Sequence, residues 1–387
     1  MKSMTSVLPS VATGIVAVLV GFASSVALLF QAAQAAGAST SQASSWVFAV
    51  CVGAGLVSIL FSWHYKMPIL AAWSTPGTAL LVASFATPIP MPEVIGAFVF
   101  CGVLIVLSGI TGIFARVANR IPVALASAML AGVLVRFGMD VFHSLKAQPV
   151  MVLVMLAVYF AARRFSPRFS VLFVLLAGVL VAQAQGMLDF SSVRLEFARP
   201  EFVVPAFSFP VMIGIGLPLF VVTMASQNLT GVAVLKASGY QPPISPVITG
   251  TGFATLLLAP FGAFSVNFAA ITAAICAGPE AHQDPAKRYI SSISAGAFYL
   301  LISLFAASIM AVFAAFPKEL VLSVAGIALF ATIANGLASA MREDWSREAA
   351  LLTLLVTASG VTLWGIGSPF WGLVAGGIGL VVTRPGK

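Results

Sequence analysis

Long apolar runs follow one another along the whole chain, and short polar or Pro/Gly-containing connections separate them. A helix that crosses the hydrocarbon core of a bilayer needs about 20 apolar residues, so this pattern predicts a series of membrane-spanning helices. We predict fourteen spans, at residues 8–32, 44–62, 68–87, 92–115, 120–138, 148–162, 169–186, 209–235, 243–261, 263–278, 289–314, 319–340, 347–364 and 368–383. The third, sixth, tenth and fourteenth are short for a complete crossing.

The composition indicates that the chain is embedded in a lipid bilayer. Hydrophobic residues are 60% of the sequence and charged residues only 8%, whereas soluble domains contain about 25% charged residues. These values exclude a soluble globular protein and predict an all-α integral membrane protein. The net charge of +8 is divided among short clusters between the apolar runs, so no basic stripe is available for a nucleic acid partner.

The sequence carries no pattern typical of a metal site or of an enzyme. Cys51, Cys101 and Cys276 each lie inside an apolar run without metal-ligand spacing, and we interpret them as small packing residues. The three histidines are scattered, and HExxH and GxSxG motifs are absent from the sequence. We therefore expect no metal, no cofactor and no intramembrane enzyme.

The longest polar interruption, residues 187–208, divides the chain into halves of seven predicted spans each. Short motifs recur at a nearly constant offset between the halves; for example, the sequence Gly-Ala-Phe at residues 96–98 returns at 296–298. A shared offset indicates an internal repeat. Because each half has an odd number of spans, the second repeat is expected to be inverted in the membrane relative to the first.

The Lys and Arg residues of the connections predict the orientation. With both termini in the cytoplasm, the inward connections hold 14 of the 19 Lys and Arg residues, and the outward connections hold the other 5. Positive charge concentrates on the cytoplasmic side of membrane proteins. We therefore expect a multi-pass protein of a bacterial inner membrane whose two termini are cytoplasmic.

Two predicted spans are interrupted at equivalent positions of the two halves. In the third, Trp73 is followed by the helix-breaking and capping sequence Ser74-Thr75-Pro76-Gly77, and in the tenth, Phe264-Ser265-Val266-Asn267 precedes an apolar run from Phe268. We predict a short extended piece followed by a half-length helix in each. Non-helical backbone at membrane depth occurs where it lines a cavity, and paired breaks of this kind point to the binding site of a transporter.

The expected chemistry of that site favours an anion. Each helix N-terminus carries about half a positive charge, so two that converge offset a carboxylate without a buried Lys or Arg. Aromatic residues beside the breaks are able to enclose an aromatic body. The eighth span adds a polar patch, residues 226–230, in an otherwise apolar helix, and this patch is a functional candidate. The predicted substrate-binding residues are Trp73, Ser74, Thr75, Pro76, Gly77, Ser226, Gln227, Asn228, Phe264, Ser265, Asn267 and Phe268.

Three longer stretches, residues 67–77, 226–243 and 277–289, resemble the BenE-type benzoate membrane transporter family of bacteria. The similarity extends over nearly the whole chain and implies a benzoate:proton symporter with a fold similar to that of uracil permease. In that fold, a core domain moves against a gate domain. The resemblance implies a core made of residues 1–115 and 209–315, a gate made of 116–186 and 316–387, and a periplasmic connection at 187–208.

The chain departs from the uracil permease pattern where that fold places substrate-binding carboxylates. The matching positions here are close to Gln227 and Asn267, whose amides hold no proton but are able to donate to an anion. The proton carrier therefore remains open among Glu93, Asp140 and Glu280. Alternatively, the substrate acid binds together with its own proton.

The sequence is compatible with several functions. The leading prediction is a secondary active transporter that imports benzoate or a similar aromatic carboxylate with protons. Another organic or inorganic anion, or a nucleobase, is the alternative on the same fold, and a passive channel or an intramembrane enzyme are alternatives of other classes. The expected partners are the substrate, protons and the lipid bilayer; a homodimer is one arrangement that the resemblance implies.

Overall fold

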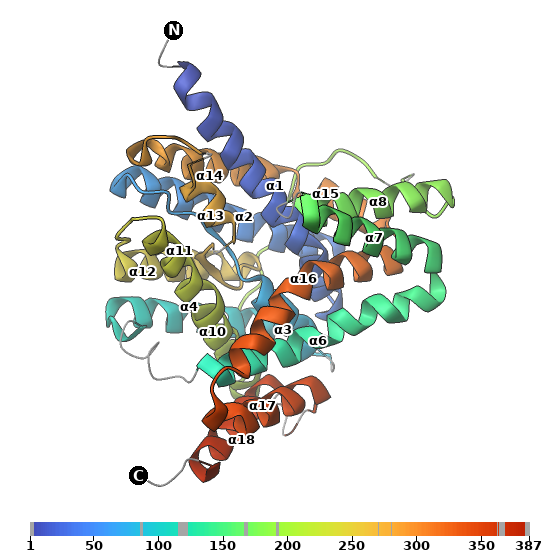
Figure 1. Ribbon diagram of the computed structural model, residues 1–387, viewed down its shortest axis with the longest axis vertical. Coiled ribbons are helices and arrows are strands. Elements are labelled where there is room, and N and C mark those ends of the chain that lie inside the picture. Colours follow the sequence, from blue (N-terminus) through green and yellow to red (C-terminus); the bar gives the residue numbers. More distant parts are fainter. Residues whose placement is uncertain are drawn as a thin grey trace.

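The computed structural model describes residues 4–85, 88–114, 123–165, 169–190, 193–269, 271–279, 281–361, 363 and 368–383. Its first half contains α1 (Met4–Ala35), α2 (Thr40–Tyr65), β1 (Ala71–Trp73), α3 (Thr75–Ser84), α4 (Met91–Ile110), α6 (Val123–Ala147), α7 (Pro149–Phe165) and α8 (Ser170–Ala184). Figure 1 shows these elements, from blue to green, interleaved with those of the second half, from yellow to red. The two halves thus form one body rather than two separate bundles.

The second half begins with a long helical segment that is not regular. It comprises α9 (Phe209–Val211), the π-helical stretch η2 (Met212–Gly216), α10 (Leu217–Val222), a second π-helical stretch η3 (Thr223–Asn228) and α11 (Leu229–Ala237). It continues with α12 (Ile244–Leu258), the 3₁₀ turn η4 (Ala259–Phe261), β2 (Val266–Phe268), α13 (Ile271–Ala277), η5 (Pro285–Lys287), α14 (Tyr289–Leu304), α15 (Ala306–Ala314), α16 (Lys318–Ala340), η6 (Asp344–Ser346), α17 (Arg347–Ser359) and α18 (Ser368–Thr383). Stretches of π-helix are frequent at functional sites, and η3 holds residues 226–228 of the predicted polar patch.

Seven helices of the described residues are long and apolar enough to cross a membrane, or up to eight if the bent pair 285–304 and 306–314 is one span. That pair is bent by 66°, whereas the apolar pattern predicts one continuous run over residues 289–314. Helices α3, α13, α17 and α18 are shorter, at 10, 7, 13 and 16 residues. The protein is therefore a predominantly helical membrane protein of several apolar spans.

The predicted interruptions are confirmed in both segments. Strands β1 and β2 pair antiparallel with Ala71 opposite Phe268, Ala72 opposite Asn267 and Trp73 opposite Val266. Each strand leads into a short helix, α3 and α13 respectively. The tertiary structure thus joins two segments that are far apart in the sequence into one small sheet.

Side chains of neighbouring helices satisfy the outer edges of this sheet. The backbone N–H of Ala71 donates to Ser58 Oγ at 2.9 Å, that of Val266 to Thr255 Oγ1 at 2.9 Å, and that of Phe268 to Asn228 Oδ1 at 2.9 Å. Lipid offers no hydrogen-bond partner, so an extended backbone at this depth needs such partners from the protein. Helices α2, α12 and the stretch η3 are therefore fixed around the strands.

Two groups of helices pack mainly within themselves. In one, α2 lies against α14, α4 against α12, and α1 against α14 and α13; in the other, α6 lies against α16 and α17, α17 against α18, and α7 against α8. Small residues let the helices approach closely: a Cβ on Gly55 would lie 2.8 Å from the carbonyl oxygen of Gly296. The contacts of α1 with α16 and of α3 with α6 join the two groups.

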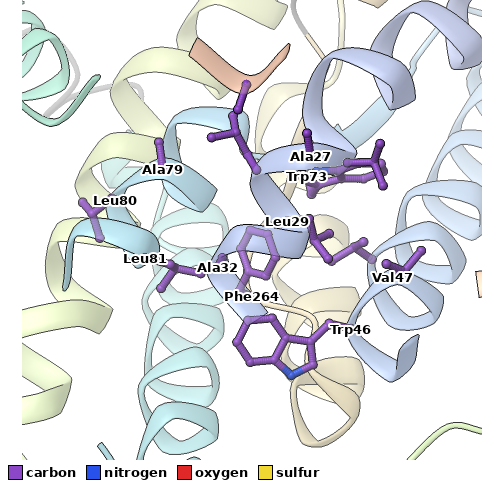
Figure 2. Packing of buried hydrophobic residues seen from close by; sticks show 14 of the residues in the cluster. Ala27, Leu29, Ala32, Trp46, Val47, Trp73, Ala79, Leu80, Leu81 and Phe264 are labelled. Atoms are coloured by element: carbon purple, nitrogen blue, oxygen red, sulfur yellow. The ribbon is translucent and has the colours of Figure 1, made fainter. Parts of the chain in front are cut away.

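A buried aromatic cluster anchors the second strand segment. The rings of Trp46, Phe98 and Phe264 lie 5.3 to 6.5 Å apart between centroids. Figure 2 shows Phe264 next to Trp46, while Trp73 occupies another part of the same hydrophobic cluster. Gly262, with a φ of 99°, lies against Trp46, and a Cβ at this position would clash with the indole ring.

The connection between the halves lies across the ends of the first group of helices. Backbone bonds join Ala198 to Leu304 and Ala206 to Pro92, and the carboxylate of Glu201 accepts from Ser41 Oγ at 2.6 Å and Gln42 Nε2 at 3.0 Å. Each of these partners belongs to α2, α4 or α14. The polar connection therefore fastens elements of both halves to one another.

Candidate functional site

A cavity of about 630 Å³ lies between the two groups of helices. Residues of α1, β1, α3, η3, α13 and α14 line one side, and residues of α6, α7, α8 and α16 line the other. This volume is within the usual range of about 300–1,000 Å³ for small-molecule sites. Since the cavity touches both groups, a displacement of one group against the other changes its shape.

Aromatic residues form the floor of the cavity. Trp73 and Tyr299 both line it and are only 3% and 1% exposed, and their ring centroids lie 5.9 Å apart with the rings edge to face. Phe22 of α1 also packs edge to face against Trp73, with 5.8 Å between the ring centroids. The indole Nε1 of Trp73 is buried without a hydrogen-bond partner. An aromatic guest is well suited to this floor, since it adds a ring to an existing edge-to-face group.

Small polar side chains complete the floor. Ser25 of α1 and Thr272 of α13 line the cavity and are largely buried. The hydroxyl of Ser25 already donates to the backbone oxygen of Gly21 at 2.7 Å. A Cβ on Gly21 would lie 2.9 Å from Thr272 Cγ2 and 3.6 Å from the Tyr299 hydroxyl, so glycine at this position keeps the floor open.

The N-terminus of α3 points its polar end toward the cavity, and Thr75 and Pro76 line it. Ser74 caps the helix: its Oγ accepts from the N–H of Gly77 at 3.0 Å, and its carbonyl accepts from the N–H of Thr78 at 2.8 Å. Proline has no N–H. In the first turn, the N–H of Thr75 is then the donor that these bonds do not use. The dipole of α3 therefore acts on the cavity with few free N–H donors.

The second interrupted segment contributes less to the cavity surface. Helix α13 has only seven residues, and the cavity meets this segment at Ala269 and Thr272. The predicted residues Phe264, Ser265, Asn267 and Phe268 are all buried and do not line the cavity. Asn267 Nδ2 donates to the carbonyl of Ser265 at 3.0 Å, while its Oδ1 has no partner.

The polar patch of η3 divides into a cavity-facing part and a structural part. Ser226 and Gln227 line the cavity, and Gln227 is half-buried with an amide that makes none of the hydrogen bonds found in the described residues. Ser226 Oγ donates to the carbonyl of Val222 at 2.6 Å. Asn228 is fully buried and accepts from the N–H of Phe268, so it holds β2 in place.

Of the twelve predicted substrate-binding residues, five line the cavity: Trp73, Thr75, Pro76, Ser226 and Gln227. The other seven do not line it and lie in or next to the two strands and the cap of α3: Ser74, Gly77, Asn228, Phe264, Ser265, Asn267 and Phe268. The roles of all twelve remain predictions. The structure shows which are in a position to touch a guest and which are in a position to hold those that do.

Sequence reasoning missed the contributions of α1, α14 and α16. Ser25, Tyr299 and Asn335 line the cavity although each lies in an unbroken apolar run. For Ser25 and Tyr299 no local signal distinguishes them from ordinary packing residues. Asn335 did offer one, because an amide inside an apolar run is a functional candidate for the same reason as Gln227.

The predicted proton carriers lie away from the cavity where they are described. Glu93 is in the first turn of α4, as predicted, and Asp140 lies 3.3 Å from His143 Nδ1 on α6 with both side chains substantially exposed. Neither lines the cavity. Glu280 lies outside the described residues. Among the described residues no group of His, Cys, Asp and Glu is arranged to hold a metal ion.

The connection after α13 is held by a buried guanidinium. Arg288 donates from Nη1 to the carbonyl of Ala277 at 2.8 Å, at the end of α13, and from Nε to that of His282 at 2.8 Å. The Tyr240 hydroxyl donates to the carbonyl of Pro285 at 2.8 Å. Burial raises the pKa of Tyr240 above its ordinary value, and the nearby positive charge of Arg288 opposes that rise. Tyr240 therefore stays a neutral donor.

Sequence comparisons give matches over nearly the whole length of the chain. The family model BenE, described as benzoate membrane transport protein, matches residues 4–382. The chain is 46% identical to the inner membrane protein YdcO of Escherichia coli, over 97% of this chain and 96% of that protein. It is 40% identical to the benzoate membrane transport protein of Acinetobacter baylyi, over 94% of this chain and 92% of that protein.

Solved structures show the same fold at low sequence identity. The transmembrane domain of the cyanobacterial bicarbonate transporter BicA matches with a TM-score of 0.59 and 13% identity, over 95% of this chain and 97% of that one. SLC26A9 matches with a TM-score of 0.62 and 12% identity, over 96% of this chain and 65% of that one. At such identities the likeness concerns the fold alone.

Proposed function

The chain belongs to the benzoate membrane transport protein family, which consists of membrane transporters and not enzymes, and we propose that it imports benzoate or a similar aromatic carboxylate. The observation that carries the proposal is the cavity between the two groups of helices, with its aromatic floor and its cavity-facing amide. An inner bacterial membrane is the proposed location, with both termini in the cytoplasm.

The aromatic ring of the substrate binds at the floor. Trp73 and Tyr299 offer ring edges and faces on one side, with Gly21 leaving space beside them. Complete burial of a phenyl group contributes about 2–3 kcal/mol. The buried Nε1 of Trp73, which has no partner within the protein, is a candidate donor to the substrate.

The carboxylate binds between the N-terminus of α3 and Gln227. Both the free amide of Gln227 and the N–H of Thr75 are donors, and the helix dipole adds a favourable potential. A hydrogen bond to a charged group contributes about 1.5–3 kcal/mol. A neutral amide at this position suits an anion, since a carboxylate there would repel it.

Transport proceeds by alternating access of a core domain, residues 1–115 and 209–315, against a gate domain, residues 116–186 and 316–387. Fourteen segments in two inverted repeats of seven provide this division. The helix packing supports it. In the proposed repeat, α2, α4, α7 and α8 correspond to α12, α14, α17 and α18. The packed pair α2 and α14 then corresponds to the packed pair α12 and α4, and the pair α7 and α8 to the pair α17 and α18. The connection at 187–208 is then periplasmic and fastened to the core.

Protons are the proposed coupling ion. Import of an anion against an inside-negative potential costs about 2.3 kcal/mol per 100 mV, so accumulation needs a co-transported positive charge. Among the described residues that line the cavity there is no carboxylate and no imidazole. Glu93, Asp140 and Glu280 stay as candidate carriers to be tested. A proton that enters on the substrate acid itself is the alternative, and it would require the neutral acid rather than the carboxylate to bind.

A test uses the purified protein in proteoliposomes with an imposed pH gradient, acidic outside. Labelled benzoate should accumulate faster than in protein-free liposomes, which measure passive entry of benzoic acid, and a protonophore should abolish the accumulation. Uracil and sulfate serve as competitors. Uptake at the rate of protein-free liposomes, together with transport of sulfate or uracil, would contradict the proposal.

A small inorganic anion is the second candidate. The fold is shared with a bicarbonate transporter, and the α3 dipole and Gln227 amide suit any anion. The aromatic floor favours the carboxylate of a ring instead, since a small hydrated anion gains nothing from Trp73 and Tyr299.

A further inference from the structure

The cavity has a buried end and an open end. Its floor residues Trp73 and Tyr299 are almost inaccessible, whereas Arg163 of α7, Asn335 and Ser339 of α16, and Thr230 of α11 line it and are exposed. The exposed residues of α7 and α16 lie within the last two turns of these helices, at the ends that the Lys and Arg distribution assigns to the cytoplasmic side. The open end is therefore a mouth toward the cytoplasm.

This mouth carries a positive charge that pairs with no carboxylate among the described residues. Arg163 is the charged side chain among the described residues that line the cavity. In the part of the chain that the structure describes, the ion pairs join Asp140 with His143 and Asp344 with Arg347, and neither involves Arg163. The forked N–H groups of its guanidinium are thus available to an anion.

The ring of Tyr159 positions this guanidinium. Arg163 Cζ lies 6.0 Å from the ring centroid, one helical turn further along α7. Tyr159 is itself buried, and its ring packs edge to face against Phe330 of α16 at 5.8 Å. The cation–π contact therefore rests on a fixed ring, and the same ring joins α7 to the helix that carries Asn335 and Ser339.

Asn335 and Ser339 are one turn apart on α16, so they lie on one face of that helix. Both are exposed at the mouth, and the Asn335 amide makes none of the hydrogen bonds found in the described residues. Together with the guanidinium of Arg163, which lines the same cavity, this amide and this hydroxyl offer donors that suit a carboxylate.

We propose that Arg163, Asn335 and Ser339 form a second, outer anion subsite at the cytoplasmic mouth, through which an aromatic carboxylate passes between the floor and the cytoplasm. The inference rests on the proposed function for the nature of the anion. Because the subsite is exposed, it acts by raising the local concentration and the association rate of the anion, and salt screens it. The outer subsite does not change the equilibrium affinity of the inner site at the floor.

The test compares Arg163→Gln with the matched control Arg164→Gln. Arg164 is the next residue along α7 and is also exposed, but it does not line the cavity. Inside-out membrane vesicles present the mouth to the added substrate. At low salt and subsaturating benzoate, we expect Arg163→Gln to lower the initial rate of benzoate exchange about 3- to 10-fold, with less than about a 2-fold difference at high salt. The rate at saturating benzoate should stay unchanged.

Further variants separate the role of charge from that of fold. Arg163→Lys should retain most of the exchange rate, and Asn335→Ala should lower it by about 2- to 3-fold at low salt. Equilibrium binding of labelled benzoate and the thermal unfolding temperature should be the same in all variants. A salt-independent loss, or a loss equal to that of Arg164→Gln, would overturn the subsite.

The two proposals fail in different ways. Absence of benzoate binding and exchange in the unmodified protein removes the proposed function. Normal binding and exchange in that protein, together with equal rates for Arg163→Gln and Arg164→Gln at low salt, removes the outer subsite alone.

Discussion

The two interrupted segments share one backbone plan, a three-residue strand followed by a short helix, yet they meet the cavity differently. In the first, Trp73, Thr75 and Pro76 line the cavity. In the second, Asn267 and Phe268 are buried and do not line it, and of the residues described there Ala269 and Thr272 reach it. The first segment thus offers its polar helix end and an aromatic side chain to a guest. The second mainly supports the first through the shared sheet.

This difference shows that two segments are able to share a backbone plan without sharing their chemistry. The ladder between β1 and β2 requires both strands to be extended, so both segments must break. Nothing in the ladder requires both to supply donors, and α13 is shorter than α3, with 7 residues against 10. Two segments with the same backbone plan are therefore able to hold an asymmetric site.

The largest expected effect contrasts Trp73 with Phe264. Trp73→Ala should raise the dissociation constant for benzoate about 30-fold or more, since it removes about 2–3 kcal/mol of ring burial at the floor. Phe264→Leu, a change in the buried cluster of the other segment, should leave that constant unchanged. Binding of labelled benzoate to both purified variants checks this. An unchanged affinity in Trp73→Ala would move the aromatic site away from the floor.

The next effect concerns stability rather than binding. Asn228→Ala removes the acceptor of the Phe268 N–H, and an unsatisfied buried donor costs about 1–3 kcal/mol. The thermal unfolding temperature in detergent should fall clearly. If instead the variant is as stable as the unmodified protein, then the second strand does not depend on η3.

Gln227→Ala, one residue away, should give the opposite result. Removal of a donor to a charged carboxylate should weaken benzoate binding by about 10-fold, with the unfolding temperature unchanged. Gln227→Glu should weaken it further, because a carboxylate repels the anion. Normal affinity in Gln227→Ala would place the carboxylate elsewhere in the cavity, and Asn267→Ala should then be measured in the same assay.

The smallest expected effect is that of the helix cap. Ser74→Ala removes the acceptor for the Gly77 N–H, and loss of such a cap costs about 0.5–2 kcal/mol. Ser74→Asp keeps an acceptor but adds a negative charge beside the carboxylate site, so it should lower benzoate affinity while it preserves the unfolding temperature. Equal affinity in both variants would argue against an anion near α3.

Much of the local structure followed from residue types. Pro76, Gly77 and the capping Ser74 stop and restart the backbone within residues 68–87, and the structure has β1, the cap and α3 there. Glu93 lies in the first helical turn of α4, as the proline before it predicted. The bend of 66° between α14 and α15 was not predicted, since no Pro or Gly marks it in residues 301–309.

The sequence by itself determined that the chain resides in a membrane, that its backbone breaks at two equivalent places, and that an amide-bearing patch interrupts the eighth run. The membrane location depends on apolar runs of about 20 residues, and the breaks and the patch depend on neighbours within about one helical turn. All of these are local properties of the sequence. Only the tertiary structure decided which side chains meet. Tyr299, Ser25, Arg163 and Asn335 come together because four distant helices pack in one rotation and register, which depends on side-chain fit across the whole fold.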